Sequence, residues 1–166
     1  MHDELTEVDI KKMKEEIEQR VAMRAHLREE VQRAKEFGDL SENDEYHQAR
    51  REKNKNDGRI RYLENMINTA VVIKADSKDG EVGLFDYVTL WDEDEEEERR
   101  IQLVTTLRQD ATMGFVSKES PLAQAIMGKK VGDRVCVKVN DKYSYFVEIR
   151  KIEKGSDNED LPISPY

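Results

Sequence analysis

The sequence predicts an α+β protein, with an N-terminal antiparallel two-helix hairpin followed by a C-terminal, mainly antiparallel β domain that carries one short helix. Apolar residues recur at alternating spacings of three and four through the first 70 residues, and short β-branched runs separated by turn residues follow. Charged residues make up 39% of the chain and hydrophobic residues 37%. A long solvated helical element beside a compact domain therefore fits the composition better than one large core.

The first helix is predicted from Leu5 to Phe37, a stretch without Pro or Gly, and the second from Asp44 to Ala70. Each carries a seam with the heptad spacing of a coiled coil. The seam of the first helix consists of Ile10, Met13, Ile17, Arg20, Arg24, Leu27, Val31 and Ala34. The seam of the second consists of Tyr46, Ala49, Lys53, Asn56, Ile60, Leu63, Ile67 and Ala70.

The two seams match when the chain folds back about residue 40, because every opposing pair of residue numbers then has the same sum. Ile17 lies opposite Leu63 in this register, and Arg24 lies opposite Asn56, where a hydrogen bond is expected. Burial of the hairpin inside a larger bundle is the alternative. The polar seam positions oppose it, because unpaired charges are costly in a deep core but reach water along their stems in a thin arm.

We place the hairpin in residues 1–74, the β domain in residues 75–153 and a flexible tail in residues 154–166. The short helix is predicted over Pro121–Met127, ending at Gly128. The acidic run Asp92–Glu98 is interpreted as a solvated loop between strands, with an anionic binding surface as the alternative. Asn140-Asp141 is expected to close a β-hairpin. The predicted strands cover residues 82–91, 99–106, 112–116, 134–139 and 143–152.

Composition and motifs restrict the function. A net charge of −9 argues against nucleic-acid binding over the whole surface, because phosphate binding depends on clustered Lys and Arg. The single cysteine, Cys136, excludes a disulfide within the chain, and we expect it to pack in its strand. We find no signal peptide at Met1–Glu4, no apolar run of membrane-spanning length and no zinc or phosphate-loop motif. We therefore expect a cytoplasmic protein without membrane contacts.

The tip of the predicted hairpin, residues 38–45, carries the candidate chemistry. Asp39 and Glu42 lie three residues apart at the fold of the arm, and Ser41 or Asn43 is expected to cap the second helix. Two carboxylates can complete an Mg²⁺ site that another macromolecule already half holds, since Mg²⁺ often takes only one or two carboxylates. Ordinary placement of acids near a helix N-terminus is the alternative, and the spacing alone does not decide between them.

Basic side chains flank this acidic point. Lys35 and Arg50 lie on either side of the tip, accompanied by Arg33 and Arg51. Such a collar can hold an RNA phosphate while the carboxylates act on a metal. Taken singly, each of these side chains also fits an ordinary solvated helix face.

Two motifs resemble those of the bacterial Gre transcript-cleavage factors. The segment GDLSENDEYH (residues 38–47), followed by GRI (residues 58–60), is similar to the N-terminal signature of that family. The segment SPLAQAIMG (residues 120–128) with VGD (residues 131–133) resembles its C-terminal signature. The likeness covers residues 5–152. It implies a coiled coil that enters the secondary channel of RNA polymerase and an FKBP-like C-terminal domain that docks at the channel rim.

The resemblance also implies roles for single residues. Asp39 and Glu42 would help the polymerase hold its second catalytic Mg²⁺, so that the polymerase itself hydrolyses backtracked RNA. The chain would be an activator, working as a monomer, without a complete active site and without stable Mg²⁺ of its own. Pro121 falls in the rim-docking segment. The contacts to the 3′ end of the RNA would fall to Lys35, Arg50, Asn43 and Tyr46.

Two positions depart from the family pattern. Asp44 stands where the family has a small residue, and extra tip acids accompany inhibition in the anti-Gre homologues, so Asp44 is a candidate modulator. Residues 55–57 (KND) replace an aromatic or aliphatic pair followed by Glu. A channel-blocking regulator is therefore the main alternative to a cleavage factor. A prolyl isomerase, the third possibility, rests on fold analogy alone.

Overall fold

The computed structural model describes residues 2–39 and 42–165. Contacts between Cα atoms divide the chain into two compact units. The hairpin unit contains Ile10–Ala70, and the β unit contains Asp3–Asp9 together with Val71–Tyr166. Within the described residues, no helix combines the length and the apolar character needed to cross a membrane.

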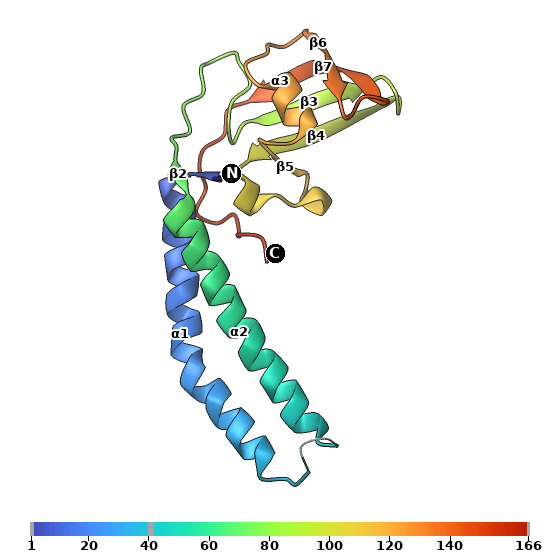
Figure 1. The fold of residues 1–166 in the computed structure, drawn as a ribbon. Helices are drawn as coiled ribbons and strands as arrows, with labels where there is room; N and C mark the ends of the chain where they lie inside the picture. Colours follow the sequence, from blue (N-terminus) through green and yellow to red (C-terminus); the bar gives the residue numbers. More distant parts are fainter. Residues whose placement is uncertain (1, 40–41, 166) are drawn as a thin grey trace. The chain divides into compact units, whose positions relative to one another are not determined.

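Two antiparallel helices, α1 (Glu7–Lys35) and α2 (Asp44–Thr69), lie side by side in the hairpin unit (Figure 1). Every predicted seam position is buried or half-buried, which confirms the face that the heptad spacing indicated. Helix α1 begins two residues after the predicted Leu5. Thr6 and Asp9 form a reciprocal capping box, in which Thr6 N donates to Asp9 Oδ2 (3.0 Å) and Asp9 N donates to Thr6 Oγ1 (3.3 Å).

The middle of the seam is polar, as predicted, but its pairing differs from the expected hydrogen bond between Arg24 and Asn56. The buried Asn56 side chain donates from Nδ2 to the backbone oxygen of Arg20 (3.0 Å) and accepts from Arg20 Nη1 (3.2 Å). Arg24 lies 3.5 Å from Asp57 instead. A carboxylate offers Arg24 an ion pair, which an uncharged amide does not. The pairing of apolar layers, such as Ile17 with Leu63, stays a prediction.

The buried Arg59 forms an ion pair with Glu16 further along the hairpin, and the sequence analysis did not predict this pair. Arg59 is 2% exposed and donates from Nε to Glu16 Oε2 (2.7 Å) and from Nη2 to Oε1 (3.3 Å). Its guanidinium also lies over the Tyr62 ring, 5.3 Å from the centroid. Burial raises the pKa of Glu16, but hydrogen bonds and charges from Arg59 and Arg20 outweigh it and leave the pKa below its usual value. The ionised carboxylate is therefore the form that this contact favours.

The β unit contains a five-stranded sheet in the order β5-β4-β3-β7-β6. Each predicted strand is present, with shifted ends. The sheet is mixed and not purely antiparallel, because β5 pairs with β4 in parallel, whereas the other neighbours are antiparallel. The bounds are β3 (Tyr87–Asp92), β4 (Glu97–Val104), β5 (Phe115–Ser117), β6 (Arg134–Lys138) and β7 (Ser144–Glu153).

Three local features of the structure differ from the sequence prediction. The strand predicted from residue 82 begins only at Tyr87, because Phe85 adopts a left-handed backbone conformation (φ 70°) that ends extended geometry. The two-residue strands β1 (Glu4–Leu5) and β2 (Val71–Val72) pair in parallel, and β1 was not predicted. The acidic run is exposed except for the buried Asp92, which accepts from the backbone N of residues 94 and 95 at 3.0 and 3.1 Å.

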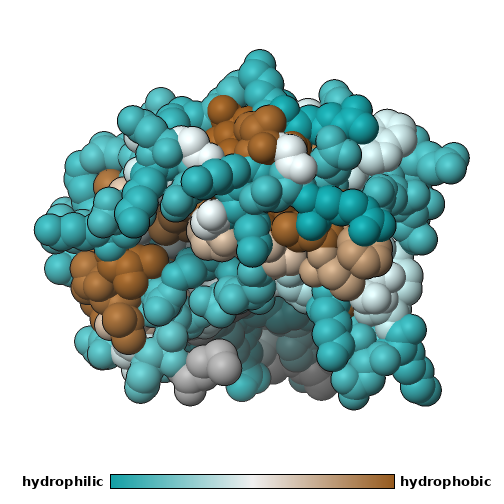
Figure 2. Space-filling model, turned by 90° about the horizontal axis from the view of Figure 1, so that it is seen from above, coloured by the Kyte–Doolittle hydropathy of each residue, from teal (hydrophilic) through white to brown (hydrophobic). Residues whose placement is uncertain are grey.

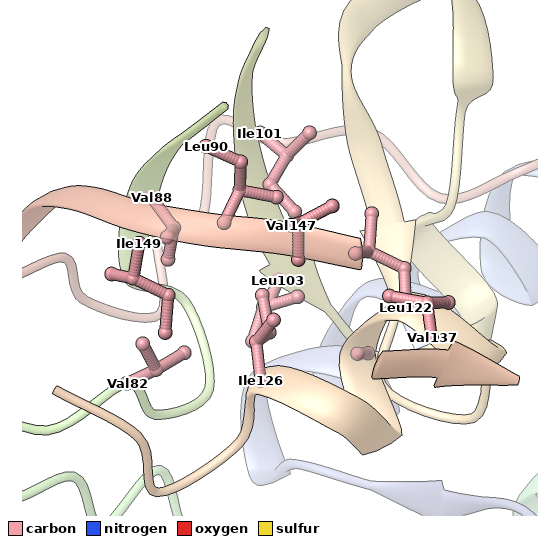
Figure 3. Close-up of a cluster of buried hydrophobic side chains, with 11 residues drawn as sticks. Val82, Val88, Leu90, Ile101, Leu103, Leu122, Ile126, Val137, Val147 and Ile149 are labelled. Carbon is pink, nitrogen blue, oxygen red and sulfur yellow. The ribbon is translucent and has the colours of Figure 1, made fainter. Parts of the chain in front are cut away.

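Apolar side chains from the sheet and from helix α3 (Pro121–Ile126) form the core of the β unit (Figure 3). Cys136 was expected to pack in its strand, but it is exposed. The alternation of β6 turns Val135 and Val137 toward the core instead. Hydrophilic side chains cover most of the face shown in Figure 2, and hydrophobic ones form separate patches. The core residues labelled in Figure 3 are Val82, Val88, Leu90, Ile101, Leu103, Leu122, Ile126, Val137, Val147 and Ile149.

The segment after residue 153 makes specific contacts with the 3₁₀ helix η1 (Thr106–Arg108) and with Gln109, which lies before a second 3₁₀ helix, η2 (Ala111–Met113). Arg108 is fully buried and pairs with Asp9 (2.6 Å) and Asp157 (2.5 Å). Ser164 N donates to the backbone oxygen of Leu107 at 2.6 Å, and its Oγ to that of Gln109 at 2.8 Å. The flexibility of residues 154–166 stays a prediction.

Candidate functional site at the hairpin tip

The tip begins where α1 ends, at Lys35. The last turn is tightened, because Glu36 N donates to the backbone oxygen of Arg33 (3.1 Å) and Phe37 N to that of Ala34 (3.3 Å). Gly38 follows with φ 121°, a conformation that side-chain-bearing residues rarely adopt. Helix α1 therefore ends two residues before the predicted Phe37, and a turn leads from it to Gly38.

Asn43 is the N-cap of α2, one of the two caps that the sequence offered. Its backbone is extended (φ −90°, ψ 93°), and its Oδ1 accepts from Tyr46 N at 3.0 Å. Its Nδ2 donates to the backbone oxygen of Ala34, near the end of α1, at 2.6 Å. Ser41, the other candidate, lies outside the described residues, as does Leu40.

Both predicted metal-binding carboxylates, Asp39 and Glu42, lie on exposed residues of the tip. Glu42 N donates to the backbone oxygen of Asp39 at 3.3 Å, so the two residues lie close together. They line an open hollow with Phe37, Asn43, Asp44 and Glu45. Carboxylate oxygens are suitable ligands for Mg²⁺. No group of three or more His, Cys, Asp or Glu among the described residues is arranged to hold a metal ion.

The departure at Asp44 has a structural consequence of its own. Asp44 is the first residue of α2, and Asp44 and Glu45 are exposed in its first turn. Negative charge there interacts favourably with the N-terminal end of the helix dipole. Asp44 also lines the same hollow as Asp39 and Glu42. Its position therefore fits both helix stabilisation and an influence on the neighbouring carboxylates.

The residues of the predicted basic collar have different surroundings. Lys35 from α1 approaches Tyr46 from α2, with Nζ 6.0 Å from the ring centroid. Tyr46 is half-buried and tilted against His47 (5.4 Å between centroids). Arg33 is already paired with Glu30 at 3.0 Å. Arg50 and Arg51 are exposed on α2.

A second basic group, further along the hairpin, was missed by the sequence analysis. Arg24 and Arg28 from α1 and Lys53 and Arg61 from α2 line one hollow, which also includes Asp57 and Leu27. The signal was present in the sequence as a spacing of four in α1 and of eight in α2, which place such residues on one face of each helix. Two of these cations, Arg24 and Lys53, are paired with Asp57 at 3.5 and 3.1 Å.

Pro121, the predicted docking residue, is an exposed residue of the β unit at the first position of α3. Ser120 caps this helix, with its Oγ accepting from Ala123 N at 3.2 Å. Proline suits the first helical position, because no intrahelical hydrogen bond is lost there. The local structure therefore accounts for Pro121 and leaves its ring available to a partner.

Comparison with known proteins places this hairpin and its acidic tip in a class of helical-hairpin transcription factors. Residues 4–72 match the profile described as "Transcription elongation factor, N-terminal", and residues 76–154 match "Transcription elongation factor, GreA/GreB, C-term". The chain belongs to the GreA/GreB family of transcription elongation factors. The resemblance seen in the two sequence motifs is thereby confirmed.

Characterised relatives agree with this assignment. Transcription elongation factor GreA of Thermoanaerobacter pseudethanolicus is 40% identical over 137 residues, which cover 81% of this chain and 87% of the relative. GreA of Leuconostoc mesenteroides is 39% identical over 146 residues, or 86% and 91% of the two chains. Among solved structures, Gfh1 of Thermus thermophilus matches with 23% identity and a TM-score of 0.42, covering 93% of this chain and 100% of that chain. A GreA/GreB protein from Nitrosomonas europaea matches with 22% identity and a TM-score of 0.39, covering 58% and 80%.

Proposed function

We propose that the hairpin tip enters the secondary channel of a bacterial RNA polymerase and stimulates the cleavage of backtracked RNA by the polymerase. The observation that carries this proposal is the pair of exposed carboxylates, Asp39 and Glu42, at the far end of a long hairpin in an elongation factor. Helices of 29 and 26 residues give an arm of roughly 40 Å at about 1.5 Å per residue. Such an arm reaches a site that the bulk of a protein cannot enter.

The tip acts by completing a metal site and not by binding RNA directly. Asp39 and Glu42 repel phosphate by themselves, and they are too few to hold Mg²⁺ alone. Beside polymerase ligands, their oxygens would help to hold a shared Mg²⁺, and that ion would supply an activated water and stabilise charge on the phosphate. Lys35 and Arg50 are the exposed cations placed to hold the RNA backbone beside them.

The β unit serves as the docking element in this proposal. Pro121 and α3 would contact the polymerase at the rim of the channel, and the exposed ring of Pro121 supports this role. The chain then acts as an activator, because the reacting groups belong to the polymerase and the tip adds two ligands. It works as a monomer in the bacterial cytoplasm, where the polymerase is.

A transcript-cleavage assay tests the proposal. Purified protein is added to backtracked elongation complexes of the homologous polymerase, and release of short 3′ RNA is followed. Asp39→Asn combined with Glu42→Gln should abolish the stimulation, because neutral amides are poor Mg²⁺ ligands. Glu45→Gln, in the same hollow, is the matched control and should retain it. Cleavage at the wild-type rate with the double variant would contradict the metal-ligand assignment.

Asp44 supports one alternative function, a regulator that occupies the channel and inhibits transcription. It is one of four exposed carboxylates in the hollow, together with Asp39, Glu42 and Glu45. Wild-type protein and Asp44→Ala are compared for cleavage and for inhibition of nucleotide addition. Conversion of an inhibitor into a cleavage activator by Asp44→Ala would establish the regulatory alternative, and activation by the wild type would reject it.

A further inference from the structure

Asn43 is adjacent in sequence to Glu42, and its side chain is directed at the backbone of both helices. Its Oδ1 accepts from Tyr46 N in the first turn of α2 (3.0 Å), and its Nδ2 donates to the oxygen of Ala34 in the last turn of α1 (2.6 Å). The residue is half-buried, unlike its exposed neighbours Glu42 and Asp44. The Asn43 amide therefore links the two helices at the base of the tip. This structural role differs from the RNA contact that the family resemblance implies.

The hydrogen bonds of Asn43 close the segment that carries the candidate ligands. The oxygen of Ala34 accepts both from Phe37 N (3.3 Å) and from Asn43 Nδ2 (2.6 Å). Residues 34 and 43 are thus held together at the two ends of the segment that includes Asp39 and Glu42. A site that shares a metal with another molecule needs its ligands held to within about 0.5 Å. The hydrogen bond from Asn43 to the oxygen of Ala34 lies where it can hold Asp39 and Glu42 in position.

We propose that Asn43 is a positioning residue, whose side chain clasps α1 to α2 at the base of the tip and fixes where Asp39 and Glu42 present their carboxylates. The inference rests on the proposed function of the tip. It assigns Asn43 no contact with RNA or metal. Its effect on cleavage passes through the geometry of the two acids.

The chain contains a matched control for this clasp. Asn56 likewise donates from Nδ2 to a backbone oxygen of α1, that of Arg20, at 3.0 Å. The Asn56 bond lies 13 residues further along α2, in the middle of the hairpin and not at its tip. Loss of either bond weakens the link between the helices, but only loss of the Asn43 bond releases the segment with the carboxylates.

The test compares Asn43→Ser with Asn56→Ser in the full chain. Serine is a good N-cap residue but is too short to reach the oxygen of Ala34, so Asn43→Ser removes the clasp and keeps the cap. Cleavage of backtracked RNA is measured as a function of Mg²⁺ concentration. Asn43→Ser should raise the concentration for half-maximal cleavage by about fivefold, the equivalent of one ordinary hydrogen bond. Asn56→Ser should leave it unchanged.

A second measurement on the free protein is independent of cleavage. Amide hydrogen exchange in residues 36–39 and 42–43 should accelerate in Asn43→Ser and stay at the wild-type rate in Asn56→Ser. Unchanged Mg²⁺ dependence in Asn43→Ser, or an equal shift in both variants, would overturn the inference. A change that depends on the identity of the RNA 3′ base would overturn it in favour of direct RNA contact.

Failure of the inference is distinguishable from failure of the proposed function. If Asp39→Asn with Glu42→Gln leaves cleavage unaltered, the tip does not supply metal ligands, and both proposals are contradicted. If that double variant abolishes cleavage while Asn43→Ser behaves as wild type, the proposed function stands and only the positioning role is overturned.

Discussion

The hairpin unit and the β unit both bury charged side chains, Arg59 and Arg108 respectively, but their apolar cores are built differently, as a seam between two helices and as a cluster on a sheet. The core of the β unit is a continuous cluster of aliphatic side chains around β3, β4, β7 and α3. In the hairpin unit, polar and charged side chains, Asn56 and Arg59, are buried alongside Met13, Ile60 and Leu63. Apolar burial stabilises a unit without specifying one register, whereas polar contacts penalise every register that leaves them unpaired. The candidate site lies on the unit whose apolar core is a seam between two helices.

Truncation of one fully buried leucine in each unit gives the largest effect and tests this difference. Leu90 in the β unit and Leu63 in the hairpin unit are both 0% exposed. Leu90→Ala should cost about 4 kcal/mol and Leu63→Ala about 2 kcal/mol, because a two-helix arm can collapse around the cavity more readily than a sheet core. Hydrogen exchange on the full chain, read separately for β3 and α2, measures both. An equal or larger cost for Leu63→Ala would contradict the contrast.

Acidification should weaken the hairpin through Glu16, with a smaller effect. Its pKa is lowered in the folded chain, mainly by the hydrogen bond and charge of Arg59 and then of Arg20, which together exceed the effect of burial. A carboxyl whose folded pKa is depressed contributes stability above its unfolded pKa, about 4.5, and loses it as the pH falls through the folded value. The hairpin should therefore be less stable at pH 3 than at pH 7.

Glu16→Gln is the control for this pH dependence. The variant should be less stable than wild type at neutral pH, because Arg59 then lacks its carboxylate partner, and its stability should change less between pH 7 and pH 3. Hydrogen exchange cannot be compared directly across this pH range, so the thermal midpoint of the helical circular-dichroism signal is followed instead. Equal pH dependence in both proteins would show that other carboxyl groups dominate.

Sequence periodicity predicted the hairpin well, because a two-helix hairpin depends on an apolar face that repeats along each helix. Such a repeat can be recognised within a short stretch of sequence. The pairing of Arg20 with Asn56 escaped prediction, since a long polar side chain can reach several partners and the spacing does not choose between them. The β1–β2 pair was missed for a related reason. Two residues carry no periodic pattern, and their partners lie 67 positions away at Val71–Val72.

The location of the candidate site followed from the motif, whereas its internal organisation did not. Asp39 and Glu42 were predicted as tip residues, and the structure places them there as exposed residues. The sequence allowed Asn43 to be an N-cap, but the second contact, with the oxygen of Ala34, depends on how closely two separate helices approach. Such distances between elements are set by packing and are not encoded in local spacing.

Site-specific crosslinking tests the central claim, insertion of the tip into the polymerase, most directly. A photoreactive phenylalanine analogue replaces Phe37 at the tip, which is 69% exposed, or Met113 in the β unit, which is similarly exposed at 65%. With backtracked complexes, the analogue at position 37 should crosslink to the 3′ segment of the RNA or to the polymerase active centre, and the analogue at position 113 should crosslink to neither. Crosslinks from position 37 confined to the outer surface of the polymerase would contradict the account.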